Sequence, residues 1–179
     1  FNQPLGRWNL RSVTNVQYMF RNCTNFNQPL DEWDVSSVTD MLALFQSCSN
    51  FNQDLNSWDT SSVTRMQDTF RANTLFRGDI SSWDTSSVTT ISYMFKDSTS
   101  HNSDLSLWDT SSVTSMNHTF YNCTLFDRNL SLWNILSVSS MDNIMTNIEL
   151  STKNYDALLV GWEGTGVLGS EDVENGNFS

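Results

Sequence analysis

Residues 51–66, FNQDLNSWDTSSVTRM, decide the fold, because closely related segments recur at a fixed interval along the chain. Residues 26–41 read FNQPLDEWDVSSVTDM, and weaker copies occupy 76–91 and 101–116. Each copy begins 25 residues after the previous one, without an insertion or a deletion. A constant period of about 20–29 residues with many apolar positions is typical of stacked repeat proteins.

The apolar positions of the repeat fall in columns. One unit of 25 residues cannot bury its own apolar face, whereas stacked units bury each other's. We therefore expect each column to form a ladder through a common core. Similar columns contain Leu30, Val38, Met41, Phe45 and Phe51, and His101 replaces phenylalanine once. The structural ladder of indoles is Trp8, Trp33, Trp58, Trp83, Trp108 and Trp133.

The first half of a unit has the spacing of a strand. Leu55, Trp58 and Thr60 follow the Leu-x-x-Leu-x-Leu spacing of leucine-rich repeats. The two-residue period of a strand would direct Trp58 and Thr60 inward and Asp59 outward. We therefore predict one short strand in each unit, and parallel stacking of these strands into a narrow sheet.

The second half of a unit has helical spacing. Val63, Met66 and Phe70 stand at i, i+3 and i+7, which suits one face of a short helix or 3-10 turn. Ser61 and Ser62 would supply the N-cap. The predicted fold is an α/β-type solenoid, a leucine-rich-repeat-like stack of six 25-residue units with short parallel strands and short helical turns.

Two regions follow from this pattern. Residues 1–150 form the six-repeat solenoid, and 151–179 form a C-terminal cap helix with an acidic, Gly-rich tail from Glu163 onward. Tyr155, Leu158, Leu159 and Trp162 have amphipathic helical spacing, with Ser151 or Thr152 as N-cap and Gly161 near the end.

The first unit has no comparable cap before it. We expect further repeats or a partner to cover it, because Trp8, Val13 and Phe20 would otherwise be exposed.

The net charge of −11 restricts the partners. Such a polyanion is a poor partner for nucleic-acid phosphates and for an anionic membrane surface. No apolar run reaches the roughly 18 residues that a membrane helix needs, so we expect no direct membrane insertion. Cations and basic partners suit this charge better.

Two columns of aspartate are the candidate binding residues. Like charges one unit apart repel, so something must offset the repulsion. Each carboxylate could cap a Ser-Ser turn as an Asx turn, or the row could bind Ca²⁺ or a basic partner. The first column is Asp34, Asp59, Asp84 and Asp109, and the second is Asp54, Asp79 and Asp104.

Arg77, Gly78 and Asp79 spell the tripeptide that integrins recognise. Asp79 belongs to a structural column, and we expect the segment to be pinned between Phe76 and Ile80 instead of projecting. The match is therefore interpreted as a coincidence of the repeat.

A threonine column raises the possibility of ice binding. Thr14, Thr39 and Thr64 follow the valine column and continue at the same step in the next units. The alternative is a hydroxyl ladder that bonds to adjacent carbonyl groups. A second rank would have to come from Thr60 and its equivalents, whose predicted direction is inward.

Reactive side chains form no recognisable constellation. Cys23 and Cys48 could pair on adjacent units, but free, buried thiols, including Cys123, are the favoured interpretation. His101 and His118 stand alone, which predicts no zinc site. Neither an ordered nucleophile and base nor a Gly-rich phosphate loop is present, so we expect no enzyme and no cofactor.

The motif F-N-Q-x-L-x-x-W-D-x-S-S-V-T-x-M resembles the BspA-like leucine-rich-repeat surface proteins, in particular their 25-residue mycoplasma surface-lipoprotein branch. Segments 26–41 and 51–66 match it best, and 150–162 is similar to the segment that often ends such arrays. The resemblance implies an extracellular or cell-surface module for adhesion or another protein–protein interaction, without catalytic residues.

Three functions remain open on the sequence. The first is a non-enzymatic interaction module that binds a protein or glycan partner through an acidic face. The second is a structural subunit that packs into an assembly through its open N-terminal repeat. The third is an ice- or calcium-binding solenoid.

Overall fold

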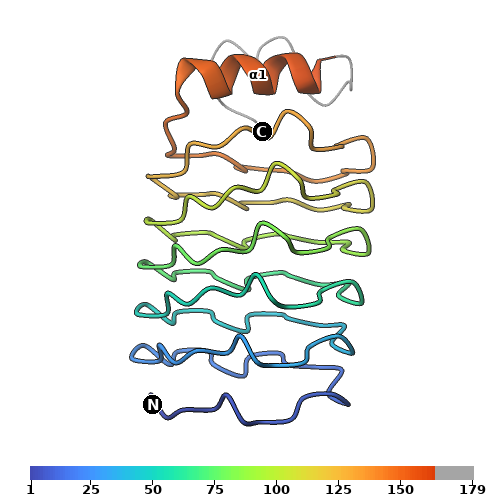
Figure 1. Cartoon of the computed structure of the whole chain (residues 1–179). Coiled ribbons are helices and arrows are strands. Elements are labelled where there is room, and N and C mark those ends of the chain that lie inside the picture. Colours follow the sequence, from blue (N-terminus) through green and yellow to red (C-terminus); the bar gives the residue numbers. More distant parts are fainter. Residues whose placement is uncertain (164–179) are drawn as a thin grey trace.

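The computed structural model describes residues 1–163, in which each 25-residue repeat makes one coil of the chain. The coils lie one above another from the N-terminus upward, and α1 (Thr152–Trp162) lies across the last coil (Figure 1). Backbone hydrogen bonds join neighbouring coils at regular positions. The acidic, Gly-rich tail expected from Glu163 onward lies outside the described residues, except for Glu163 itself.

The predicted α/β-type solenoid with parallel strands and helical turns is wrong. Within residues 1–163, α1 is the sole helix and no strand forms. Neighbouring coils meet in isolated parallel bridges of one residue each instead of in a sheet. The bridges join Asn15 to Asp40, Asp40 to Arg65, Arg65 to Thr90, Thr90 to Ser115, and Ser115 to Ser140.

The predicted helical turn is replaced by alternating bonds within and between coils. The amides of Tyr18 and Phe20 donate to the next coil, at Leu42 and Leu44, over 2.9 and 3.0 Å. The intervening amide of Met19 closes a turn on Val16 at 3.3 Å. Because every second amide bonds outside its own coil, the continuous i to i−4 pattern of an α-helix cannot form.

Left-handed backbone conformations accompany this alternation. Tyr18 has φ of 58° and Asn22 has φ of 63°, although neither is glycine. Such conformations cost free energy for most side chains, and the bonds between coils offset that cost. The same two positions are left-handed in every later coil, at Ala43, Ser47, Asp68, Ala72, Tyr93, Asp97, His118, Asn122, Asn143 and Asn147.

The predicted strand is also a turn. The amide of Trp58 bonds to the carbonyl oxygen of Leu55 at 3.1 Å, within the segment expected to be extended. The directions of the side chains are nevertheless as predicted, because Trp58 and Thr60 are buried and Asp59 is exposed. Burial alternates here through the geometry of a turn and not through the pleat of a strand.

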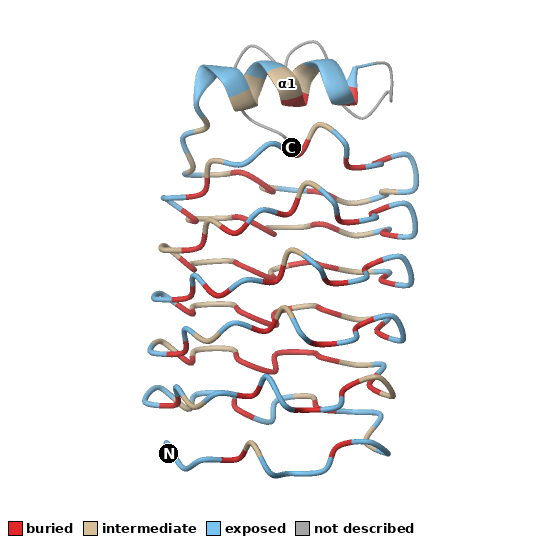
Figure 2. Cartoon of the chain, viewed as in Figure 1, coloured by how far each residue is buried: buried red, intermediate tan, exposed pale blue. Residues whose placement is uncertain are grey.

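Aromatic rings fill the interior of the stack. Phe45 lies 5.5 Å from Phe70 and 4.2 Å from Phe51, which begins the next coil, with nearly parallel planes. Figure 2 shows the buried residues recurring at the same places in successive coils. Each added coil therefore extends two adjoining columns of stacked rings, and the contacts are the favourable offset kind.

The indoles form a third column. Trp58 and Trp83 are parallel, with ring centroids 6.1 Å apart, and the column runs from Trp33 to Trp133. Trp8 is the exception, with 55% of its surface exposed. In the first coil Phe1 is 59% exposed and Val13 is half-buried, whereas Phe20 is buried, contrary to expectation. Phe20 is covered because it stacks on Phe26 at 4.2 Å and on Phe45 at 5.4 Å.

Helix α1 covers the apolar end of the last coil. Leu158 and Trp162 are buried and join the common core. Gly161 allows the approach, since a Cβ there would overlap the backbone of Ser131. Ser151 occupies the N-cap position without a side-chain cap bond; its hydroxyl and amide instead bind the carboxylate of Asp127 at 3.0 and 2.9 Å.

Candidate functional site

The first aspartate column consists of capped turns. One oxygen of Asp59, Oδ1, accepts hydrogen bonds from the amide of Ser61 at 3.1 Å and from its hydroxyl at 2.6 Å. Asp34 and Asp84 make the same pair of bonds to Ser36 and Ser86. The Asx-turn interpretation is therefore confirmed for this column, and the serines do not act as helix N-caps because no helix follows.

Asparagine performs the same task at the two ends of the column. The side-chain oxygen of Asn9 accepts the amide of Arg11 at 3.1 Å, and that of Asn134 accepts the amide of Leu136 at 3.0 Å. The turn thus needs the acceptor oxygen and not the negative charge. A carboxylate at the four central positions supplies a charge that the fold itself does not require.

The capping bonds lower the pKa of three of these carboxyl groups, Asp34, Asp59 and Asp109. The hydroxyl and amide of Ser61 hold the pKa of Asp59 below its usual range, although burial and the charge of Asp34 act weakly in the opposite direction. The pKa values of Asp34 and Asp109 are lowered by the equivalent serines. In the described part of the chain, Oδ2 of Asp59 accepts no hydrogen bond, so it faces solvent ready for a donor.

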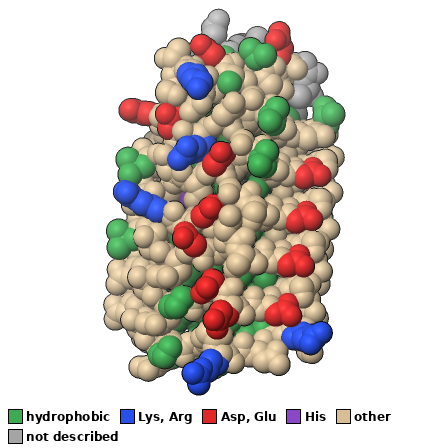
Figure 3. All heavy atoms as spheres, in the orientation of Figure 1, with side chains coloured by type: hydrophobic (Ala, Val, Ile, Leu, Met, Phe, Trp, Pro, Cys, Tyr) green, Lys and Arg blue, Asp and Glu red, His purple; other side chains and the backbone are tan. Residues whose placement is uncertain are grey.

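The second column is less uniform. Oδ1 of Asp54 accepts the amide of Asp79 in the next coil at 2.9 Å. Asp79 and Asp104 cap their own turns by accepting the amides of Ser81 and Ser106 at 2.9 and 3.0 Å. All three are exposed or nearly so, and Figure 3 shows acidic side chains following the stack in two lines.

The two columns do not converge on a metal centre. No three His, Cys, Asp or Glu side chains among residues 1–163 lie close enough together to hold a metal ion. The carboxylates are instead spread along the stack at the spacing of hydrogen-bonded coils, roughly 5 Å. This arrangement suits a partner that carries several separated donors.

The Arg-Gly-Asp segment is held flat against the stack. The amide of Arg77 donates to Asn52 at 2.7 Å, and the amide of Asp79 donates to Asp54. Gly78 is buried, and a Cβ there would overlap the carbonyl group of Gln53. Phe76 and Ile80 anchor the two ends in the core, so the segment does not project as a loop.

The threonine column bonds to its own backbone. The hydroxyl of Thr64 donates to the carbonyl oxygen of Thr39 at 3.2 Å, and that of Thr89 donates to Thr64 at 3.1 Å. Thr60 is buried and donates to the carbonyl of Asp84 at 2.9 Å. The hydroxyl ladder predicted as the alternative to ice binding is confirmed, and the inward column supplies no second exposed rank.

The three cysteines are free thiols. Cys48 donates to the carbonyl oxygen of Phe20 at 2.8 Å, and Cys123 donates to Phe95 at the same distance. Ser98 makes the equivalent bond to Phe70 at 2.5 Å. The column therefore supplies a buried donor for a phenylalanine carbonyl. Burial raises the pKa of Cys48 to about 12 and that of Cys123 also upward, which keeps both protonated.

Each histidine ring stacks on the ring of another aromatic residue and not on the other histidine. His101 is fully buried in the phenylalanine column, 3.8 Å from Phe95, and neither ring nitrogen has a partner among the described residues. His118 stacks on Tyr93 at 4.9 Å. His101 thus occupies a place that the repeat assigns to an apolar ring.

Sequence reasoning missed a cavity of about 420 Å³ at the edge of the fourth to sixth coils. Its signal is a break in a polar motif: Asn-Gln follows the first phenylalanine of three units, and Arg77-Gly78 replaces it in the fourth. The lining residues are Arg77, Ser100, Asn102, Leu125 and Arg128.

Comparison with known families adds one result. The model of the family described as Mycoplasma protein of unknown function, DUF285, matches residues 1–77 and 44–158. The chain belongs to the DUF285 family. The two matches together cover every coil and reach into α1, so the family pattern is that of the coils just described. No curated protein and no solved structure matches the chain. Helix α1, the sole helix of residues 1–163, is not long and apolar enough to cross a membrane.

Proposed function

We propose that this DUF285 protein is a non-enzymatic interaction module that binds a basic protein or glycan partner through its aspartate columns. The observation that carries the proposal is the exposed row of turn-capping aspartate side chains, one to a coil, on Asp34, Asp59, Asp84 and Asp109. Each turn holds its carboxylate by one oxygen, and the geometry is therefore set before a partner arrives. Such preorganisation reduces the cost of ordering side chains on binding.

The charge supports the same proposal. Asparagine caps the turn at Asn9 and Asn134, so the four aspartates exceed what folding needs. With a net charge of −11, the protein attracts basic partners and repels nucleic acid and anionic membrane surfaces. Paired donors on a partner, such as lysine or arginine side chains two coils apart, would meet two carboxylates at once.

The resemblance of the repeat motif to one group of surface proteins also supports the proposal. The 25-residue motif resembles that of BspA-like surface proteins, and this resemblance supports an extracellular or cell-surface location and a role in adhesion. A structural subunit role and ice or calcium binding have less support. The threonine hydroxyls are used within the ladder, and no acidic cluster in residues 1–163 has the density that calcium requires.

The test separates the carboxylate row from overall charge. Asp59→Asn with Asp84→Asn keeps both turn acceptors and removes two charges from the column. Asp31→Asn with Glu32→Gln removes two charges outside it. Binding to an immobilised lysine-rich peptide is measured for both double variants by biolayer interferometry, with melting temperatures recorded alongside.

We expect the column variant to bind at least tenfold more weakly at an unchanged melting temperature, and the control to bind nearly as well as the parent. Equal losses of binding in both double variants would show that binding depends only on the net charge of the protein, and would reject the aspartate row as a site. A loss of stability without a loss of binding would assign the column to turn capping alone.

A further inference from the structure

Asparagines and glutamines form a regular ladder along one edge of the first coils. The side-chain oxygen of Asn2 accepts the amide of Asn27 at 3.0 Å, and Asn27 in turn accepts the amide of Asn52 at 2.9 Å. The amide groups of Gln28 and Gln53 donate to these same oxygens at 3.0 and 2.8 Å. The backbone amides of Asn27, Asn52 and Arg77 therefore each find an acceptor in the coil before them.

The fourth coil breaks this ladder. Its residue at the asparagine position is Arg77, whose side chain carries no acceptor. The backbone amide of Asn102 in the next coil consequently has no hydrogen-bond partner within residues 1–163. Gly78 replaces the glutamine, at a point where the backbone of Gln53 approaches too closely for a Cβ. The cavity of about 420 Å³ described above lies at this break, with Arg77 and Asn102 in its lining.

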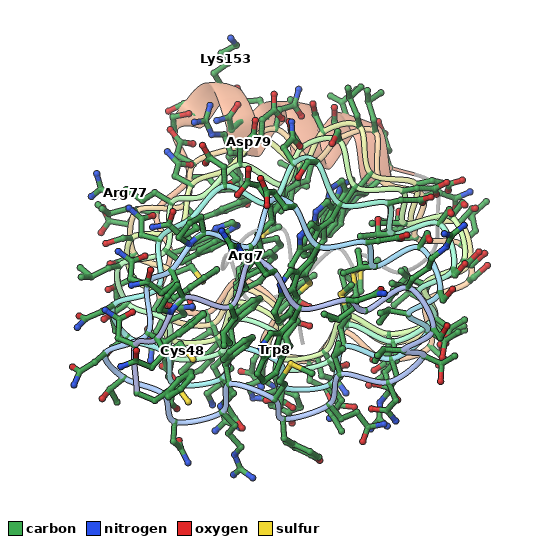
Figure 4. The ribbon with its side chains drawn as sticks, turned by 60° about the horizontal axis from the view of Figure 1, so that its bottom comes forward. Arg7, Trp8, Cys48, Arg77, Asp79 and Lys153 are labelled. Atoms are coloured by element: carbon green, nitrogen blue, oxygen red, sulfur yellow. The ribbon has the colours of Figure 1, made fainter. Side chains whose placement is uncertain are left out.

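Two arginines, Arg77 and Arg128, line the cavity together with Asn102. The Nε of Arg128 donates to the backbone and side-chain oxygens of Asn102 at 2.8 and 3.1 Å, which holds the arginine against the cavity. Figure 4 shows the Arg77 side chain extending outward from the edge of the coils. Neither arginine forms an ion pair in the described region, whereas Arg65 and Arg71 pair with Asp40 and Asp68.

The nearby carboxylates of Asp104 and Asp127 form no ion pair with Arg77 or Arg128 among residues 1–163. The carboxylate of Asp127 accepts bonds from Ser151 and from the side chain of Asn154 at 2.7 Å. Asp104 accepts the amide of Ser106. Hydrogen bonds from Ser106 and from Asn154 lower the pKa of Asp104 and of Asp127. Arg128 adds a smaller contribution to both, but it lies beyond ion-pair distance of each among residues 1–163. The two terminal nitrogens of the Arg128 guanidinium therefore remain available to donate hydrogen bonds to a ligand.

We propose that this cavity binds the carboxylate of a small acidic sugar between Arg77 and Arg128. The two guanidinium groups and the amide of Asn102 match an oxyanion, which accepts charge-assisted hydrogen bonds. Ser100 offers a hydroxyl and Leu125 an apolar contact for the body of a sugar. The volume falls in the range of about 300–1,000 Å³ that small-molecule sites occupy. The net charge of −11 opposes a long polyanion, which favours a ligand with a single acid group.

The site is tested with sodium glucuronate as the probe and the full chain as the receptor. Two-dimensional ¹H–¹⁵N NMR follows the amide of Asn102, and isothermal titration calorimetry measures the dissociation constant. Glucose, sulfate and phosphate are titrated in parallel arms. We expect saturable glucuronate binding with a downfield shift of the Asn102 amide proton, weaker binding of sulfate and phosphate, and none of glucose.

Arg77→Asn is the decisive variant, because it restores the ladder and supplies an acceptor for the Asn102 amide. It should raise the glucuronate dissociation constant at least tenfold while the melting temperature stays equal or rises. Arg128→Gln should weaken binding similarly, and Arg7→Gln, at the far end of the stack, should leave it unchanged. Arg7 and Arg77 lie apart in Figure 4.

Three results would overturn the proposal. They are an unshifted Asn102 amide at saturating glucuronate, undiminished binding by Arg77→Asn, and binding of glucose or of sulfate as tight as that of glucuronate. The outcome is independent of the aspartate columns, since the double variant of Asp59 and Asp84 retains every residue of the cavity.

Discussion

The indole nitrogen of Trp58 donates a 2.8 Å hydrogen bond to the carbonyl oxygen of Leu30, one coil earlier in the stack. The same bond joins Trp83 to Leu55 at 2.9 Å. Each tryptophan thus fills the core and adds a second hydrogen bond, from the neighbouring coil, to a carbonyl oxygen that already accepts a backbone amide of its own turn. The Trp column replaces part of the hydrogen bonding that a regular sheet would provide.

Trp58→Phe should destabilise the protein by about 2–4 kcal/mol, because it removes the hydrogen bond between the coils and leaves part of the indole volume empty. Urea denaturation followed by circular dichroism measures the change. Trp8→Phe is the matched control: Trp8 is 55% exposed, and we expect a change within about 0.5 kcal/mol. Equal effects of the two substitutions would contradict the proposed role of the bond between coils.

His101→Phe should stabilise the protein by about 1–3 kcal/mol. The substitution restores the phenylalanine of the repeat and removes two ring nitrogens buried without partners in the described region. Thermal denaturation at pH 7 measures the gain. His118→Phe serves as the comparison, because His118 is only half-buried and lies outside this column, so its effect should be smaller. A lower melting temperature for His101→Phe would show that the imidazole has an unrecognised structural role.

In the His101→Phe variant, the free energy of unfolding should fall less steeply as the pH is lowered. Burial, with a smaller contribution from Arg128, lowers the pKa of His101 from 6.5 to about 3. Between these values the unfolded state binds the proton and the folded state does not, so stability falls as the pH falls. The expected slope from this group is about 1.4 kcal/mol per pH unit. Denaturation of parent and His101→Phe at pH 7, 6, 5 and 4 tests it, and parallel curves would refute it.

Ser61→Ala should raise the pKa of Asp59 toward its ordinary value near 3.8, because the hydroxyl of Ser61 is the main cause of the lowered pKa. The folded-state pKa lies below the unfolded value, so the stabilisation is present above pH 3.8 and is lost as the pH falls. Carboxyl ¹³C NMR across pH 2–6 gives the titration curve. Ser62→Ala removes a neighbouring hydroxyl that makes no bond to Asp59, and the same curve as the parent is expected.

Gly161→Ala should destabilise the end of the stack, although alanine is the better helix former by about 1 kcal/mol. A methyl group at residue 161 would overlap the backbone of Ser131, so α1 must move away from the last coil. Overpacking of this kind costs about 1–3 kcal/mol. Hydrogen exchange in 152–162 measures the loss, and Val160→Ala, at an exposed helix position, is the control. Slower exchange in Gly161→Ala would mean that α1 adapts without strain.

The local conformation could not be predicted from the sequence, and the reason is visible at Tyr18. Its left-handed φ of 58° is stabilised by the bond of its amide to Leu42 in the next coil. Tyr18 is neither a glycine nor a typical turn residue, so periodicity favoured a helical face. The same limitation applies at Trp58, whose local turn has the apolar spacing of a strand.

The sequence by itself determined which side chains share a column, because identical steps of 25 residues place equivalent positions of successive coils together. It also determined the capped aspartate turns, since Asp59 and Ser61 are close neighbours in the chain. Only the tertiary structure decided the backbone conformation, the burial of Phe20 and the cavity between Arg77 and Arg128. Those features depend on contacts between residues about 25 or more positions apart, whose geometry no local pattern encodes.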